Sequence, residues 1–190
     1  MSTQTSAERV VNGVDTDAVA QTMTAIDEDP TRARFNFRLS NFWVTGTHNR
    51  ALVKDFSAGG EVVRRDTTFF VYDKDEHPLI FGQDRGANPV EYLLAGLAGC
   101  VTTTLVLLAA RKGITLTKVD ARLDGDLDAQ GLFGMAEDVR PGYEALHVTM
   151  DVEGDASREE LAELVRQAAA RSPVADTVAH GTRLEVSLAD

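Results

Sequence analysis

The chain has a single cysteine, Cys100, among its 190 residues. One thiol cannot form an intrachain disulfide, so the small secreted classes that depend on disulfides for stability are excluded. Residues 1–8 also lack the basic segment followed by an apolar run that a secretory signal requires. We therefore expect a cytoplasmic protein, since thiols stay reduced in that compartment.

Basic residues are scarce as well. The chain has 19 Lys and Arg against 30 Asp and Glu, a formal net charge of −11, and it contains no basic run. Nucleic acids and anionic membranes are therefore not expected as partners, because both are bound through clustered cations. The hydrophobic fraction of 43% is close to that of globular domains, and a chain of this length should bury roughly 70% of its unfolded surface.

Residues 1–33 are predicted to form an N-terminal extension, and residues 34–190 the main domain. Between Asp15 and Pro30, three apolar residues recur at i, i+4 and i+7, which indicates a short amphipathic helix: Val19, Met23 and Ile26. From Phe35 the hydrophobic period changes to two and continues through Trp43, which is typical of a half-buried strand.

That first strand is predicted to turn in a hairpin at Gly46. A second strand is expected from about His48 to Phe56, with a turn at Gly59–Gly60, and a third over residues 67–72. The first half of the chain is thus interpreted as a small antiparallel meander.

A long helix is predicted next, because the 19 residues from Tyr92 to Ala110 carry no charge and both ends are well marked. Asn88, Pro89 and Glu91 form a helix start with a capping box, and Gly113 follows the end. Apolar residues on all faces indicate a helix enclosed by protein. A transmembrane span is the alternative; three consecutive threonines and two glycines dilute its hydropathy.

In the second half of the chain, apolar and polar residues alternate again. Strands are predicted around residues 119–124 and 143–152, joined by an irregular acidic loop over about 126–142. Ser157 and Glu160 form a second capping box, whose helix must stop before Pro173. A last strand is expected over Leu184, Val186 and Leu188. This order of elements predicts an α+β domain with mostly antiparallel pairing.

Cys100 has two interpretations. A free cysteine in an apolar helix is usually a small hydrophobic residue. Against that, Gly96 and Gly99 each cost about 1 kcal/mol relative to alanine in a helix interior, which suggests a close approach or a bend beside the thiol. His48 could serve as a proton donor near Arg50, yet the four scattered histidines show no ligand spacing, so neither a metal nor another cofactor is predicted.

The segment from Asn88 to Cys100 resembles the central-helix signature of the OsmC/Ohr family, and Arg171–Val174 resembles its second-cysteine segment. The resemblance implies an OsmC-like α+β fold, with mostly antiparallel sheets wrapped around a long central helix in an intertwined homodimer. In the family's peroxidases, the first cysteine is oxidised by a hydroperoxide and the second resolves the sulfenic acid. Ser172 occupies the second position here, so a sulfenic acid at Cys100 would need an external thiol reductant.

The same resemblance implies the site residues. Cys100 is the expected nucleophile, Arg50 the arginine that holds its thiolate, and Glu91 the carboxylate that orients Arg50, although Glu91 also fits a simple capping role. A guanidinium next to a thiol lowers the pKa of the thiol below its usual 8.5. The residues expected to contact the substrate are Ser172, Leu97 and Tyr92.

Three functions follow as hypotheses. The first is a thiol-dependent peroxidase for organic hydroperoxides. The second is a non-catalytic relative that binds a small apolar ligand in a pocket at the dimer interface, which the missing second cysteine favours. The third is a cysteine-dependent hydrolase or transferase.

Overall fold

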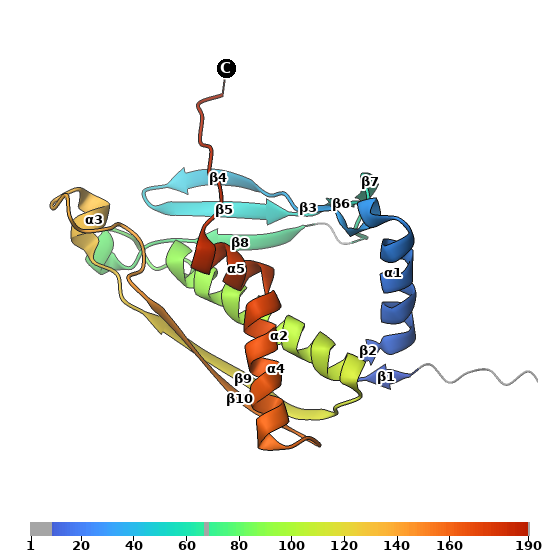
Figure 1. Cartoon of the computed structure of the whole chain (residues 1–190). Coiled ribbons are helices and arrows are strands. Elements are labelled where there is room, and N and C mark those ends of the chain that lie inside the picture. The colour runs from blue at the N-terminus through green and yellow to red at the C-terminus, as the bar shows by residue number, and fades with distance from the viewer. Residues whose placement is uncertain (1–8, 67–68, 190) are drawn as a thin grey trace, which may run out of the picture. The chain divides into compact units, whose positions relative to one another are not determined.

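A computed structural model describes residues 9–66 and 69–189 (Figure 1). The described chain divides into two units, one of Arg9 with residues 15–93 and one of residues 10–14 with residues 94–189. Each unit combines helices with antiparallel strands, so the predicted α+β class with a long helix is confirmed.

The first unit begins with helix α1 (Thr16–Glu28), which confirms the short helix predicted from the apolar spacing. Its N-cap is Asp15, whose side chain accepts hydrogen bonds from the backbone of Asp17 and Ala18, both at 2.9 Å. A 3₁₀ turn over Pro30–Ala33 follows. Residues 1–8 of the predicted extension lie outside the described residues, and its boundary at residue 33 stays a prediction.

Two three-stranded antiparallel sheets complete this unit. One has the order β4 (Ser40–Thr45), β5 (His48–Val53), β8 (Phe70–Lys74), and the other β3 (Phe35–Asn36), β6 (Phe56–Ala58), β7 (Glu61–Val63). The predicted meander is therefore split between two sheets. Gly59 and Gly60 turn the chain between β6 and β7 with φ values of 58° and 85°, which favour glycine. Residues 67–68 of the predicted third strand lie outside the described residues.

Helix α2 (Pro89–Lys112) is the long helix predicted from the sequence. The Asn88 side chain accepts a hydrogen bond from the Val90 backbone at 2.9 Å, and the Glu91 carboxylate accepts one from the Asn88 backbone at 2.8 Å. Among the described residues, α2 alone is long and apolar enough to cross a membrane by length and composition, with a mean hydropathy of 2.1. The same composition is typical of a core helix in a soluble protein.

The second unit packs α2 against the antiparallel hairpin β9 (Leu116–Gly125) and β10 (Leu146–Gly154) and against α4 (Arg158–Arg171). The predicted capping box of Ser157 and Glu160 opens α4. A shorter helix, α5 (Pro173–His180), follows. The buried core of this unit consists of seven apolar residues: Leu97, Val101, Leu105, Leu108, Ala109, Leu164 and Ala168.

The N-terminal strands β1 (Val10–Val11) and β2 (Val14–Asp15) form a two-stranded hairpin that the sequence reading missed. At its turn, the Asn12 side chain donates to the Ile114 carbonyl at 2.9 Å and accepts from the Leu116 backbone at 2.8 Å. These two bonds fix the hairpin to the segment between α2 and β9.

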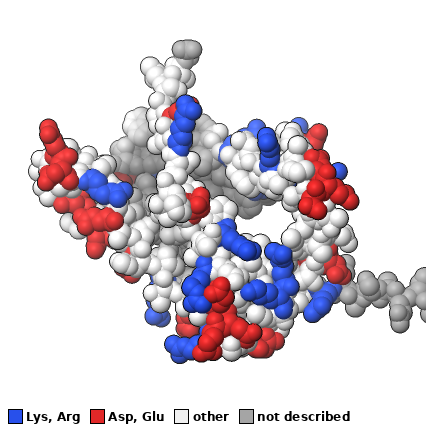
Figure 2. Space-filling view, in the orientation of Figure 1, with Lys and Arg blue, Asp and Glu red and all other residues white. Residues whose placement is uncertain are grey.

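The predicted last strand is wrong. Residues 182–189 have no regular structure, and Leu184, Val186 and Leu188 are 81%, 87% and 97% exposed. Alternating apolar residues mark one face of a strand, but a strand also needs a neighbour for its backbone hydrogen bonds, and no described residue supplies one here. The acidic loop contains a short helix, α3 (Ala129–Phe133), and Figure 2 shows acidic side chains gathered over this region.

Candidate functional site

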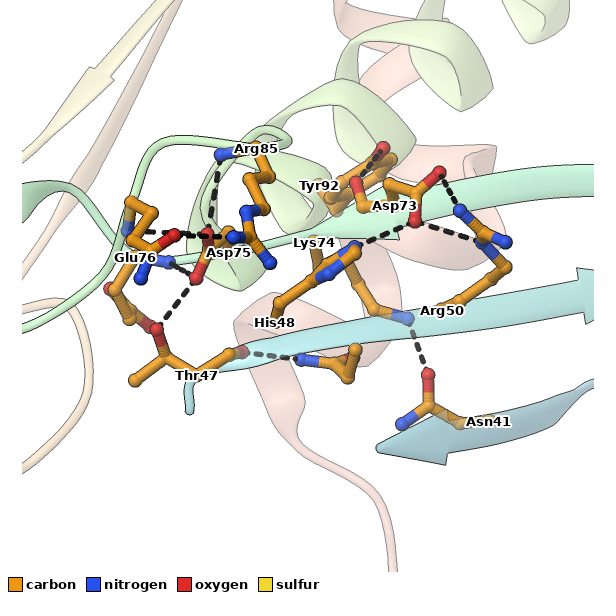
Figure 3. A network of polar contacts seen from close by, with 12 residues as sticks. Asn41, Thr47, His48, Arg50, Asp73, Lys74, Asp75, Glu76, Arg85 and Tyr92 are labelled. Carbon is orange, nitrogen blue, oxygen red and sulfur yellow. Dashed lines mark hydrogen bonds and ion pairs between the residues drawn. The ribbon is translucent and has the colours of Figure 1, made fainter. Parts of the chain in front are cut away.

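A cluster of charged side chains lies where β5 pairs with β8 (Figure 3). Arg50 is directly opposite Asp73 in the antiparallel register. The two side chains form a bidentate pair, in which Arg50 Nε donates to Asp73 Oδ1 at 2.9 Å and Nη2 donates to Oδ2 at 3.1 Å. His48 Nε2 lies 2.8 Å from the same Oδ1 atom. One carboxylate therefore holds both an arginine and a histidine.

These contacts shift the ionisation of Asp73. Its pKa is lowered, first by the hydrogen bonds from Arg50 and then by the one from His48, which stabilise the carboxylate. The pKa of Arg50 is raised by Asp73 in return. The pair thus stays charged, and the Arg50 guanidinium is half exposed, with 49% of its side-chain surface accessible. Arg50 is consequently an oriented cation that still reaches solvent.

Tyr92, one of the expected substrate contacts, is tied to the same residue. Its hydroxyl donates to the Asp73 carbonyl oxygen at 2.8 Å, and its ring packs edge-on against Tyr72 with the centroids 5.9 Å apart. Tyr92 lies in the first turn of α2, so this bond attaches the start of that helix to β8. The structure therefore gives Tyr92 an anchoring role.

Glu91 has the capping role, which the sequence left open beside a pairing with Arg50. Its carboxylate accepts a hydrogen bond from the Asn88 backbone, and among the described residues Arg50 pairs with Asp73. The physical reason is local: a glutamate at the third helical position reaches back to its own N-cap. Asp73 was not predicted as the partner of Arg50. The two residues meet only through the register of β5 and β8, which cannot be read from the sequence alone.

The loop that follows β8 is folded around Asp75, which is only 2% exposed. The Asp75 carboxylate accepts a hydrogen bond from the Thr47 hydroxyl at 2.6 Å. It also accepts three backbone hydrogen bonds, from Glu76 at 2.9 Å and from Gln83 and Arg85 at 3.2 Å each. Two glycines permit this close loop, because a Cβ at Gly82 would overlap the Glu76 carbonyl and one at Gly86 would overlap that of Asp73.

Cys100 lies in the part of α2 that belongs to the second unit, and it is half-buried. Its neighbours on the helix, Leu97 and Val101, are 4% and 3% exposed. Both line an apolar cavity of about 210 Å³ whose other walls are side chains of β10, α4 and α5. A small apolar molecule therefore has a place next to the turn of α2 that carries the thiol.

Ser172, another expected substrate contact, is fully buried between α4 and α5. It is the N-cap of α5, and its hydroxyl accepts a hydrogen bond from the Ala175 backbone at 3.2 Å. Helix α5 contributes Val178 and Ala179 to the apolar cavity. Ser172 thus positions a wall of the cavity.

Comparison with known proteins defines the class of this chain. The sequence model of OsmC-like proteins matches residues 82–187, which is more than half of the chain. The chain therefore belongs to the OsmC-like family, as the resemblance of the α2 segment indicated.

One relative is the hydroperoxide reductase of Mycoplasma genitalium, 31% identical over 103 residues that span 53% of this chain and 67% of that protein. Solved structures share the fold. An OsmC-like protein from Mycoplasma pneumoniae superimposes with a TM-score of 0.59 at 19% identity, over 76% of this chain and 87% of that one. A putative osmotic stress induced and detoxification response protein from Psychrobacter arcticus 273-4 gives 0.55 at 14% identity, over 73% and 85%.

The Asp75 contacts predict a pH-dependent stability. Its pKa is lowered to about 2, first by the Thr47 hydroxyl, so the stabilisation is present above the ordinary value of about 4 and is lost as the pH falls towards 2. Asp75→Asn places an amide nitrogen against hydrogen-bond donors and should lower Tm at pH 7 on the order of 5 °C. Thermal melts should show the variant and the wild type converging as the pH approaches 2. Asp84→Asn, an exposed change in the same loop, is the control and should melt with the wild type throughout.

Proposed function

We propose that this protein is a thiol-dependent peroxidase that reduces organic hydroperoxides through Cys100. The observation that carries the proposal is the half-buried thiol between Leu97 and Val101, two residues that line an apolar cavity of about 210 Å³. Membership of the OsmC-like family and the name hydroperoxide reductase carried by the Mycoplasma genitalium relative support the same chemistry. The cavity accounts for the preference for an organic peroxide, since its walls are apolar.

In the proposed reaction the Cys100 thiolate attacks the terminal oxygen of the hydroperoxide. A sulfur–oxygen bond forms, the oxygen–oxygen bond breaks, and the alkoxide takes up a proton and leaves as the alcohol. Cys100 becomes a sulfenic acid. A first external thiol then condenses with the sulfenic acid, releasing water, and a second external thiol attacks the mixed disulfide and regenerates Cys100.

An external reductant is part of the proposal because the chain has one cysteine and Ser172 stands at the second-cysteine position. A hydroxyl forms no disulfide. Each turnover therefore consumes two equivalents of external thiol per hydroperoxide. The cytoplasm supplies such thiols in abundance, which is the basis for proposing that the protein works there.

The first test is peroxide consumption with cumene hydroperoxide, a thiol reductant and the purified protein. We expect turnover, a Cys100 sulfenic acid trapped by mass spectrometry when the thiol is omitted, and faster reaction with cumene hydroperoxide than with hydrogen peroxide. Cys100→Ser should abolish both turnover and trapping, because serine is a far weaker nucleophile.

A protein that binds apolar ligands without turnover is the second candidate, favoured by the serine at position 172. It would leave Cys100 unoxidised in the assay above while an apolar fluorophore still bound to the cavity. That combination would reject the peroxidase.

We propose further that Arg50 stabilises the Cys100 thiolate, because Asp73 holds its guanidinium in one orientation and leaves it half exposed. Arg50→Ala should slow the alkylation of Cys100 at pH 7 roughly tenfold or more, because a neighbouring cation stabilises the reacting thiolate. The measurement is the rate of iodoacetamide labelling between pH 5 and pH 10. Arg38→Ala is the matched control, since the Arg38 guanidinium bonds to the Ser57 hydroxyl. Equal profiles for the two variants would exclude the role of Arg50.

We also propose that the protein is a homodimer. Helix α2 is apolar on all faces, yet only 33% of its most hydrophobic window is buried within one chain. Strand β4 exposes apolar residues on both sides, with Phe42 54% and Trp43 75% accessible. A second copy that covers these surfaces would bury them at the expected gain of roughly 25 cal/mol per Å².

Sedimentation equilibrium should therefore give twice the chain mass of 20.6 kDa. Leu107→Glu, on the exposed side of α2, should shift the equilibrium towards the monomer because it would bury a charge at the interface. Leu132→Glu in the α3 loop serves as the comparison and should leave the mass unchanged. A single-chain mass at every concentration would contradict the proposal.

A further inference from the structure

His48 makes one hydrogen bond that the proposed chemistry does not yet use. It lies two residues before Arg50 on β5, so both side chains are on the same face of the strand, and both bond to Oδ1 of Asp73 on the neighbouring strand (Figure 3). The histidine is buried, at 8% exposure, whereas Arg50 reaches solvent. The Asp73 carboxylate thus accepts one hydrogen bond from the buried His48 and others from the solvent-exposed Arg50.

The geometry assigns the proton of this bond. Nε2 of His48 is 2.8 Å from a carboxylate oxygen, and two acceptors would repel each other at that distance, so Nε2 carries hydrogen and donates. The other ring nitrogen, Nδ1, is buried and has no hydrogen-bond partner in the described part of the chain. A buried nitrogen without a partner lowers stability, and an apolar side chain at this position would avoid that cost. The hydrogen bond from Nε2 to Asp73 is what a histidine adds here.

We infer that His48 is a positioning residue, which fixes the Asp73 carboxylate so that both its oxygens stay aligned with the Arg50 guanidinium. An arginine–carboxylate pair that is half exposed gains little energy and exchanges readily with water. A buried donor on Oδ1 removes the rotational freedom of the carboxylate, and the Tyr92 hydroxyl on the Asp73 carbonyl fixes the main chain beneath it. Arg50 is then oriented before any substrate arrives.

The inference rests on the proposed role of Arg50, but its first readout does not depend on peroxidase activity. In ¹⁵N-labelled wild-type protein, long-range correlations should show hydrogen on Nε2 of His48. The Arg50 Nε–H should exchange slowly with solvent, because it is held by Asp73. His48→Leu should speed that exchange at least tenfold, and His48→Gln should retain most of the protection, because its amide nitrogen reaches the place of Nε2.

The second readout connects the residue to the thiol. His48→Leu should slow Cys100 alkylation at pH 7 roughly tenfold, and His48→Gln should restore it. In the Arg50→Ala background, His48→Leu should have no additional effect, because His48 acts only through Arg50. Circular dichroism and Tm establish that each variant is folded.

Several results would overturn the inference. They are hydrogen on Nδ1 with a bare Nε2, unchanged Arg50 Nε–H exchange in a folded His48→Leu variant, or an equal loss in the leucine and glutamine variants. If His48→Leu fails to fold, the tautomer in the wild type and the glutamine variant still decide. A protein with altered Arg50 exchange but an inert Cys100 would instead reject the proposed peroxidase and leave the positioning role intact.

Discussion

The Asp73 carboxylate is the interaction on which the charged site depends. The carboxylate oxygens accept hydrogen bonds from Arg50 and His48 on β5, and the main-chain carbonyl of Asp73 accepts one from the Tyr92 hydroxyl on α2. One residue therefore links two strands and a helix. Directly after β8 comes Asp75, whose carboxylate accepts backbone hydrogen bonds from the following loop. Without the negative charge at position 73, the Arg50 side chain would lose its bidentate partner, and the His48 side chain would lose the one hydrogen bond that it makes to the described residues.

Helix α2 imposes a second constraint. Its uncharged sequence demands burial all round, and the core of the second unit uses the face that contains Leu97, Val101, Leu105 and Leu108. The apolar surface of α2 that stays exposed within one chain is the reason for proposing a homodimer. Cys100 is half-buried on the turn of α2 whose residues Leu97 and Val101 line an apolar cavity.

Elements whose signals are local were predictable. The caps of α2 and α4 come from residues three apart in sequence, and the structure has both, at Asn88 with Glu91 and at Ser157 with Glu160. The strand over residues 182–189 failed because its alternation needs a neighbouring strand to become structure. Tyr92 and Ser172 were expected to contact the substrate, and each uses its hydroxyl in an internal hydrogen bond. The Tyr92 bond reaches a strand carbonyl 19 residues away, so it depends on the tertiary structure.

The sequence by itself determined the single thiol, the serine at position 172, the long apolar helix and the family that these residues indicate. Each is a property of composition or of spacing along one helix, where neighbours in space are neighbours in the chain. The tertiary structure decided which carboxylate Arg50 binds, that His48 shares it, and that α5 closes an apolar cavity. These depend on strand register and on the packing of elements far apart in the chain, and both are set by the free energy of the whole fold.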